Sequence, residues 1–464
     1  MAHLPDSERQ LEEDAAQLQR LGYAQELLRG MGGFSNFAVS FSIISILTGA
    51  VTLYGHGLRF GGPMVMGVGW PLVAVMTLTV AASLAQLASS FPTAGALYHW
   101  AAMLGGPRVG FFTAWLNTLG QFAITAGIDY GLAEFLADML GWPRERMSVL
   151  PLYAGILLSH AVLNHVGVRV VAWLNDFSAW YHVGGVAVLI GALALFAPKQ
   201  DAAFLMTRFS SETPLYAYGF LIGLLQAQWT FTGYDASAHV SEETKDPTRN
   251  APWGIFLSVA VSAVAGYLLL GAVTLAIQDL PSTAAAANPF LHVLTQGLGP
   301  ALGGALVGLP ASKWLASVSP RFRSPAVAVW VSVAGSGLVA LWAEAYAAMV
   351  ALSTLALYAS YALPVWVGLR ARRSGTWSHR GPWDLGRASS WVNVVALVWC
   401  GVVMVLFVLP PNQLAGYTFA GALGLLGLYW ALVQRHSFTG PKVTLLRPPE
   451  AAATSAAPSS PSSG

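Results

Sequence analysis

Two short clusters of small and polar residues interrupt long apolar stretches of this chain. The first lies in FSIISILTGA, residues 41–50, and the second lies in TFTGYD, residues 230–235. Their small or polar members are Ser42, Ser45, Thr48, Gly49, Thr230, Thr232, Gly233 and Asp235. Residues of these types bond to the nearby backbone or leave it flexible, so both clusters predict an interruption of a helix.

An interrupted helix exposes polar backbone groups that can bind a charged solute. Free N–H groups at one broken end suit a carboxylate, and free C=O groups at the other suit an ammonium. We expect the two interruptions, centred near Gly49 and Gly233, to face each other and to hold a zwitterion. Alternatively, these residues only allow close helix packing, and Asp235 is an interfacial residue, because the polar run SEETKDPTRN follows it closely.

The elements that must position these clusters are membrane-spanning helices. Only 9% of the 464 residues are charged and 55% are hydrophobic, with a mean hydropathy of +0.58, whereas soluble domains carry about 25% charged residues. A helix of about 20 apolar residues crosses the hydrocarbon core and satisfies its own backbone there. The composition therefore predicts an all-α polytopic membrane protein.

Apolar runs bounded by Gly, Pro and charged residues predict eleven spans. They cover residues 34–54, 64–88, 109–137, 149–166, 171–197, 215–240, 253–277, 325–342, 345–369, 391–410 and 415–434. The two clusters fall in spans one and six, which correspond if the chain contains two halves of five helices. Paired interruptions at corresponding positions are typical of a binding site at the midplane of an inverted-repeat transporter.

The distribution of Lys and Arg predicts one further crossing within residues 278–312. With that crossing and a cytosolic N-terminus, 18 of the 23 Lys and Arg residues lie on the cytosolic side; without it, only 7 do. Cytosolic loops are rich in Lys and Arg, so the crossing and cytosolic termini are favoured. The candidate helix, Leu291–Leu309, is a poor span because it contains His292, Gln296, Pro300 and five glycines.

These spans predict the organisation of the whole chain. The expected parts are a cytosolic N-terminal segment (1–33), a first five-helix repeat (34–198), a second repeat (215–370), two additional helices (391–434) and a cytosolic, largely disordered tail (435–464). The N-terminal segment lacks the apolar core of a signal peptide. The single cysteine, Cys400, lies in an apolar run, which excludes an intrachain disulfide framework.

Three blocks of the sequence resemble a known family. They are GGFSNFAVSFSIISILTGAVTLYGHGL, LAQLASSFPTAGALYHWAAMLGGP and WTFTGYDASAHVSEETKDPTRNAPWGI. In this order they resemble the amino acid–polyamine–organocation (APC) superfamily, in its amino acid/choline and GABA permease branch. The resemblance extends from Gly30 to about Arg435. It implies a leucine-transporter-type fold of five plus five inverted helices and two more, with alternating-access transport of amino acids, GABA, choline or polyamines.

The resemblance also implies site residues at matching positions. The carboxylate cradle would comprise Ser45, Ile46, Leu47, Thr48 and Gly49, and the amine-side and gating segment would comprise Phe231, Thr232, Gly233 and Tyr234. Asn117 in span three could reach the same site, or could form an interhelical hydrogen bond instead.

The chain departs from the family pattern around residues 278–312, where about 30 residues of an eighth span are missing. In sodium-coupled relatives that span helps to form an ion site, so Na+ coupling is less favoured here than H+ coupling. His182 in span five and Asp235 are the candidates for H+ coupling. A lone histidine such as His182 can also be a packed or interfacial residue.

Other chemistry is not indicated by the sequence. Nucleotide-binding, zinc-protease and Cys/His metal motifs are missing, so neither an enzyme nor a metal or cofactor site is expected. Asp129 and Glu134 in span three could flank an outer vestibule, but because they lie near the external boundary they are expected to be solvated. The basic run 370–380 indicates contact with lipid headgroups rather than nucleic acid.

We therefore predict a secondary active transporter of a GABA-like amino acid or a related amine in the plasma membrane. The alternative is a non-transporting sensor, or an inactive truncated paralogue, on the same scaffold. A channel is less favoured, because a closed cradle at the midplane is typical of alternating access.

Overall fold

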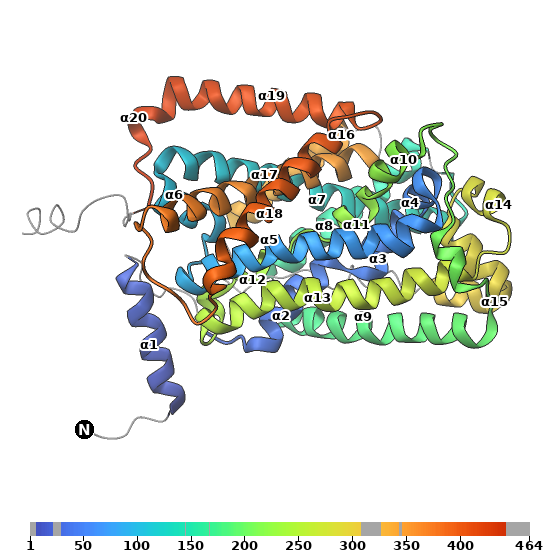
Figure 1. Ribbon diagram of the computed structural model, residues 1–464, viewed down its shortest axis with the longest axis horizontal. Coiled ribbons are helices and arrows are strands. Elements are labelled where there is room, and N and C mark those ends of the chain that lie inside the picture. Colours follow the sequence, from blue (N-terminus) through green and yellow to red (C-terminus); the bar gives the residue numbers. More distant parts are fainter. Residues whose placement is uncertain are drawn as a thin grey trace, which may run out of the picture.

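Helices of span length, running along one common direction, make up most of the protein in the computed structural model (Figure 1). The structure describes residues 6–21, 29–143, 145–166, 168–307, 326–342 and 346–441. The α-helices are α1 (Asp6–Arg20), α2 (Gly33–Ile44), α3 (Ile46–Thr52), α4 (Tyr54–Gly61), α5 (Trp70–Ser90), α6 (Ala96–Gly105), α7 (Pro107–Leu140), α8 (Arg146–Val166), α9 (Val168–Phe196), α10 (Tyr216–Gly223), α11 (Leu225–Thr230), α12 (Ala236–His239), α13 (Pro247–Leu275), α14 (Leu280–Ala285), α15 (Pro289–Val307), α16 (Ala326–Trp342), α17 (Tyr346–Arg373), α18 (Ser389–Leu406), α19 (Gln413–Tyr429) and α20 (Arg435–Ser437). Short 3-10 or π turns are η1 (Val65–Gly69), η2 (Ala202–Met206), η3 (Ser241–Glu243), η5 (Gly386–Ala388) and η6 (Trp430–Gln434).

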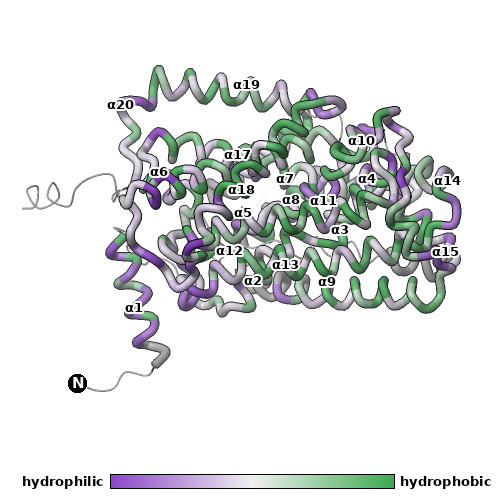
Figure 2. The backbone as a smooth tube through the Cα atoms, in the orientation of Figure 1, coloured by the Kyte–Doolittle hydropathy of each residue, from purple (hydrophilic) through white to green (hydrophobic). Residues whose placement is uncertain are grey.

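The long helices of the structure coincide with the apolar runs of the sequence. Eight helices among the described residues are long and apolar enough to cross a membrane, and the hydrophobic colouring extends along the middle of the bundle (Figure 2). Each of the eleven predicted spans coincides with helix in the structure. The prediction of an all-α polytopic membrane protein is therefore confirmed, whereas the division into two five-helix repeats stays a prediction.

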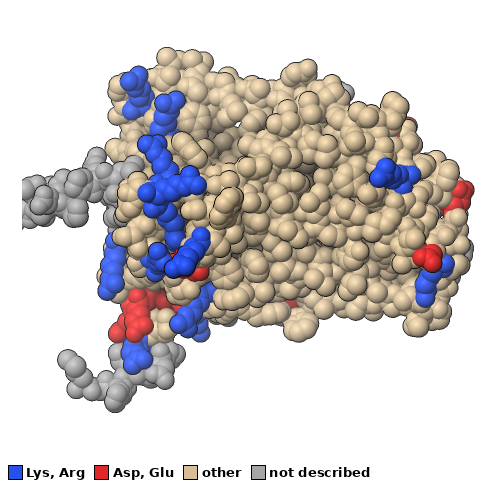
Figure 3. Space-filling view, in the orientation of Figure 1, with Lys and Arg blue, Asp and Glu red and all other residues tan. Residues whose placement is uncertain are grey.

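Lys and Arg side chains gather at the end of the bundle that carries α1, which we call the basic end (Figure 3). They come from α1, the start of α7, the η3–α13 connection, the first turn of α13, the end of α17 and η5: Arg20, Arg108, Lys245, Arg249, Arg370, Arg372, Arg373 and Arg387. The middle of the visible face is almost free of charged side chains, as a lipid-covered belt requires.

The helices pack closely where one of them presents a glycine. A Cβ at Gly120 of α7 would lie 2.7 Å from Leu357 of α17, and one at Gly266 of α13 would overlap the Trp70 ring at the start of α5. Small residues allow helix backbones to approach each other in lipid, where dispersion contacts replace the hydrophobic effect. These contacts hold α7, α17, α13 and α5 as the core that surrounds the interrupted helices.

The N-terminal segment is attached to the loop before α13. The Asp14 carboxylate of α1 accepts a hydrogen bond from the Asp246 backbone N–H (3.0 Å), and the Arg29 guanidinium donates to the Thr244 carbonyl (2.7 Å). Burial raises the pKa of the Asp14 carboxyl above its usual value, although these neighbours oppose the effect. Of the tail that is predicted to be largely disordered (435–464), residues 435–437 form α20, and residues 442–464 lie outside the described part.

Helices α13 and α16 both end opposite the basic end. Helix α13 leaves the basic end, and the Gln200 N–H bonds to its last residue, Leu275, at the opposite end. Helix α16 also ends there, where the Arg146 guanidinium donates to the Leu341 carbonyl. The crossing that the charge pattern predicts within residues 278–312 stays a prediction. Helix α15 lies beside α4 and the end of α9 and is kinked at Gly299 (φ 79°), and residues 308–325 lie outside the described part.

Candidate binding site at two broken helices

The first interruption lies at Ser45, between α2 and α3. Ser45 has φ 41° and ψ 82°, a left-handed conformation that costs a non-glycine residue about 1–2 kcal/mol. The helix resumes at Ile46, and the Gly49 N–H donates to the Ser45 carbonyl (2.6 Å). The expectation of a break centred near Gly49 is therefore wrong, since Gly49 already lies inside the restarted helix.

A histidine from α9 holds the hydroxyl of Ser45. The Ser45 Oγ lies 2.6 Å from Nε2 of His182, and the other ring nitrogen, Nδ1, lies 2.8 Å from the Ser178 carbonyl oxygen. Because a carbonyl oxygen only accepts, Nδ1 carries a hydrogen, so the neutral ring accepts the Ser45 hydroxyl hydrogen at Nε2. Both side chains are fully buried. The structure thus joins two residues that the sequence singled out separately.

The second interruption separates α11 from α12, as the sequence predicts. Gly233 in this link has φ 83°, and a Cβ there would overlap the Ile43 side chain of α2. The Phe231 carbonyl, freed by the break, accepts a hydrogen bond from the Tyr358 hydroxyl of α17 (3.0 Å). Only glycine suits both the positive φ and the close approach of the neighbouring helix.

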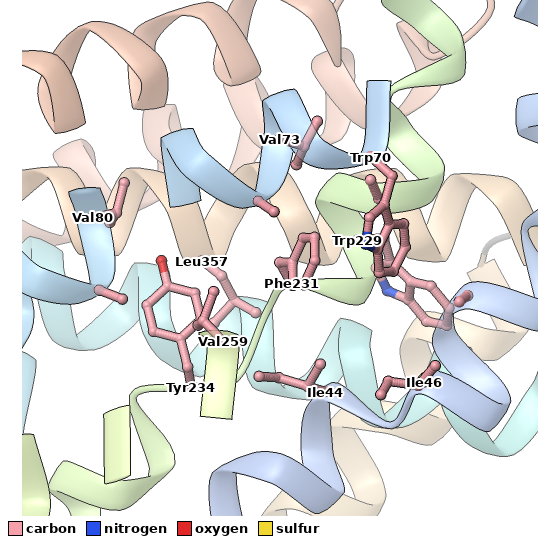
Figure 4. Packing of buried hydrophobic residues seen from close by; sticks show 14 of the residues in the cluster. Ile44, Ile46, Trp70, Val73, Val80, Trp229, Phe231, Tyr234, Val259 and Leu357 are labelled. Atoms are coloured by element: carbon pink, nitrogen blue, oxygen red, sulfur yellow. The ribbon is translucent and has the colours of Figure 1, made fainter. Parts of the chain in front are cut away.

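The two interruptions lie side by side in the core of the bundle. Figure 4 shows Ile44 and Ile46 flanking the first break, close to the link that carries Phe231 and Tyr234. Toward the opposite end, the Gln226 side chain of α11 donates to the Ala50 carbonyl of α3 (3.1 Å). Both broken helices therefore face each other at the same depth.

Toward the basic end, the halves α2 and α12 are joined by side-chain hydrogen bonds. The hydroxyls of Ser40 and Ser237 lie 2.7 Å apart, and Asn36 donates to the Ser237 carbonyl (2.9 Å). Sequence reasoning missed these contacts. The available signal was the four-residue spacing of Asn36 and Ser40, which places both residues on one face of α2.

Asp235 is fully buried directly behind the second break. Its carboxylate accepts a hydrogen bond from the Tyr361 hydroxyl (2.7 Å), lies 3.3 Å from His239 Nε2 and accepts a longer contact from the Asn117 amide (3.4 Å). The alternative reading of Asp235 as an interfacial residue is wrong, because its side chain is 0% exposed. His239 was missed, although its i, i+4 spacing from Asp235 was visible in the sequence.

One polar side chain beside the first break has no partner. The Ser42 hydroxyl, three residues before Ser45, is 2% exposed and forms no hydrogen bond in the structure. The first N–H groups of α3 also lack acceptors within their own helix. Buried donors without partners cost about 1–3 kcal/mol each, so this place favours a polar occupant.

A cavity of about 610 Å³ opens at the end opposite the basic end. Its lining includes Arg59, Glu134, Thr52 and Tyr346. The Tyr346 hydroxyl donates to Thr52 Oγ1 (3.0 Å), and its ring meets Trp229 edge-on at 5.9 Å. Trp229 immediately precedes the residues of the second break, so this aromatic pair lies between the cavity and that break.

Of the two acidic residues that the sequence places near the external boundary, only Glu134 lies at the cavity. Glu134 lines the cavity, but Asp129 is 1% exposed and its carboxylate lies 3.2 Å from His160 Nδ1 on α8. The expectation of a solvated Asp129 is wrong. Asp129 lies on a face of α7 that packs against α8, where His160 is its partner. Within the described residues, no group of three or more His, Cys, Asp or Glu side chains could hold a metal ion.

Apolar helices of span length and two facing helix breaks define a multi-pass integral membrane protein with an interrupted core. The family model for amino acid permeases matches residues 32–307 and 306–430. The chain belongs to this family, a member of the APC superfamily, and the resemblance predicted from the three sequence blocks is confirmed. It is a transporter-family protein rather than an enzyme.

Similar proteins with established names support the assignment. The amino-acid permease BAT1 of Arabidopsis thaliana is 34% identical, covering 92% of this chain and 96% of its own length, and the BAT1 homolog of Oryza sativa is 35% identical, with 93% and 96% covered. The GABA-specific permease of Saccharomyces cerevisiae is 26% identical over 92% of this chain and 86% of its own length.

A solved structure shows the same fold. A mutant form of the manganese transporter of Eremococcus coleocola has a TM-score of 0.52 and 14% sequence identity, with 94% of this chain and 96% of that chain covered. The family match is divided at residues 306–307, within the stretch where the sequence predicts a shortened eighth span. The alignment with BAT1 spans 499 residues, more than the part of this chain that it covers, so the relative contains residues without a counterpart here.

Proposed function

We propose that this protein moves a GABA-like amino acid or a related amine, such as choline or a polyamine, by alternating access, with the substrate held between the two breaks. The observation that carries the proposal is the meeting of the Ser45 break with the Gly233 break in the core. The substrate carboxylate faces the first N–H groups of α3, from Ile46 to Thr48, and the Ser42 hydroxyl. The ammonium faces the aromatic and carbonyl groups of the second break.

In the proposed state the basic end is closed, and an aromatic pair covers the site on the side of the cavity. Hydrogen bonds between Ser40 and Ser237 join the two broken helices on the closed side. On the side of the cavity, the bond between Tyr346 and Thr52 and the contact with Trp229 cover the site. Transport then requires these two sets of contacts to break and form in alternation, as expected for rigid-body gating around a fixed site.

We place the basic end in the cytosol and the protein in the plasma membrane. The reason for the orientation is that cytosolic loops and helix ends carry most Lys and Arg residues. Arg370 and Arg373 at the end of α17 are exposed there and suit anionic lipid headgroups. Arg372 between them is instead held by contacts within the protein. It stacks on Trp377 (4.1 Å) and pairs with Asp384 (3.1 Å).

Proton coupling through His182 follows from the hydrogen bond that it shares with Ser45. When the ring is neutral, Nε2 accepts the Ser45 hydroxyl hydrogen; when it is protonated, both nitrogens donate and the Ser45 hydroxyl must turn around. Ser45 occupies the strained residue of the first break. A proton on His182 therefore changes the bonding at the point where α2 and α3 separate.

His182→Ala is expected to remove the acceleration of uptake by an acidic exterior, with a decrease of about tenfold at acidic pH. The measurement is uptake of labelled GABA by proteoliposomes across a pH series. His160→Ala is the matched control, because His160 also lies in the bundle but pairs with Asp129 away from both breaks. An unchanged pH profile in His182→Ala would contradict this coupling role.

The proposed function is tested by measuring binding and flux of GABA, choline, polyamines and the standard amino acids on the same purified protein. We expect a ligand that raises the thermal stability of the protein also to be exchanged across the liposome membrane. Stabilisation by a ligand without any exchange would instead support the non-transporting sensor.

A further inference from the structure

The imidazole of His239 has an oxygen acceptor at both of its nitrogens. Nδ1 lies 3.1 Å from the Ala94 carbonyl oxygen, and Nε2 lies 3.3 Å from Oδ2 of Asp235. Neither a carbonyl nor a carboxylate oxygen can donate a hydrogen. A neutral ring that donates to the Ala94 carbonyl through Nδ1 has no hydrogen at Nε2, and Nε2 forms no hydrogen bond in the structure. One additional proton on the His239–Asp235 pair would place a hydrogen between Nε2 and Oδ2.

The two members of the pair differ in their access to solvent. The His239 side chain is 33% exposed, whereas the Asp235 side chain is 0% exposed. The Nε2 atom that faces Asp235 is buried, so the exposed part of the ring lies away from the carboxylate. His239 lies at the end of α12, shortly before η3 and the loop that leads to α13. A proton leaving or reaching Asp235 from the basic end therefore meets His239 first.

The buried side of the pair is connected to the second break. The Tyr361 hydroxyl donates to Oδ1 of Asp235 (2.7 Å), and its oxygen accepts the backbone N–H of Gly233 (3.2 Å). Gly233 is the residue whose left-handed conformation forms the break. The charge of Asp235 is thus coupled through one hydroxyl to the unwound backbone.

The other groups around His239 are few. The imidazole of His99 on α6 interacts electrostatically with His239, and Glu242 of η3 accepts a hydrogen bond from the Ala94 N–H (3.4 Å). The facing residues of α2 and α13, Ser40 and Gly254, do not titrate, and both contact Ser237 of α12. Tyr361 faces the pair from α17 through Asp235. Charge changes here are therefore dominated by His239 and Asp235, with His99 opposing a positive charge on His239.

We propose that His239 is the group through which the transported proton leaves toward the basic end, an inference that rests on the proposed H+-coupled transport. In the loaded pair one proton lies between Nε2 and Oδ2. When His239 passes that proton to water at the basic end, a neutral ring acceptor faces the Asp235 carboxylate and the two repel each other. Asp235 then depends on Tyr361 and Asn117 alone, which loosens α12 from its contacts and favours opening at the basic end.

The test variant is His239→Gln, whose side-chain amide can donate to Asp235 but cannot exchange a proton. We expect its counterflow of labelled GABA, which needs no net proton movement, to stay within about threefold of the unsubstituted protein. Accumulation driven by a pH gradient is expected to fall by about tenfold or more. His160→Gln, which changes the other His–Asp pair, is expected to keep both activities.

The outcomes separate the two proposals. Gradient-driven accumulation in His239→Gln equal to that of the unsubstituted protein would overturn the role of His239 alone. Absence of counterflow in the unsubstituted protein would overturn the proposed function itself. If His239→Gln does not fold, the unsubstituted protein is measured in oriented vesicles. The exit rate is then expected to depend on pH at the basic end, and an equal dependence on both sides overturns the inference.

Discussion

Gly233→Ala is expected to abolish transport, with a decrease in uptake of about 100-fold. Gly233 has φ 83°, and an added Cβ would overlap the Ile43 side chain of α2. The backbone conformation alone costs an alanine about 1–3 kcal/mol, and the overlap forces the two breaks apart. The protein should still assemble, because the long helices around the break are unchanged. The measurement is uptake in proteoliposomes, normalised to protein that elutes as a single species.

Two glycines of other spans provide the matched controls. A Cβ at Gly184 of α9 or at Gly271 of α13 would meet no atom within 4 Å, and neither residue has a positive φ. Gly184→Ala and Gly271→Ala are therefore expected to transport normally. Normal uptake by Gly233→Ala would show that the second break does not need its left-handed residue.

Asp235→Ala is expected to lower the free energy of unfolding by about 3–5 kcal/mol, the usual effect of removing one member of a buried ion pair. The Tyr361 hydroxyl and His239 Nε2 would both lose the oxygen that they face. Asp235→Asn is expected to cost much less. Its Oδ1 still accepts from Tyr361, and its amide can donate to a neutral His239 ring.

Thermal unfolding of the two variants in detergent measures this difference. Asp279→Ala serves as the control, because the Asp279 side chain is exposed and forms no capping hydrogen bond. Equal losses of stability in Asp235→Ala and Asp235→Asn would indicate that the charge, rather than the hydrogen-bond acceptor, holds this part of the core together.

The spans and the second break could be predicted because their causes are local. An apolar run of sufficient length in lipid must be helical. The segment Thr-Gly-Tyr-Asp, residues 232–235, contains a glycine, which adopts positive φ readily, and an aspartate, whose carboxylate needs polar partners in lipid. The family resemblance added the order of the helices. The crossing that charge counting predicts within residues 278–312 stays a prediction.

The first break was misplaced by four residues because its cause is not local. Thr48 and Gly49 have weaker helix preferences than their neighbours, yet the helix continues through Gly49. Ser45 departs from helical geometry at a place where its hydroxyl meets His182, 137 positions later in the chain. Sequence patterns within one span do not contain that contact.

The burial of the carboxylates also depended on distant residues. His239 could have been found from its spacing, since residues four apart share a helix face. Tyr361, by contrast, reaches Asp235 from α17, and His160 reaches Asp129 from α8. A buried acid is tolerated only where such partners exist, so its placement follows from the tertiary structure.

The central claim is that one small charged molecule binds between the Ser45 and Gly233 breaks. Its most direct test is an experimental structure of the full chain with the best-stabilising amino acid bound. The account predicts ligand density with its carboxylate beside the N–H groups of Ile46 and Leu47 and its other end at Phe231–Gly233. Density confined to the cavity beside Arg59, or helices continuous through both breaks, would contradict it.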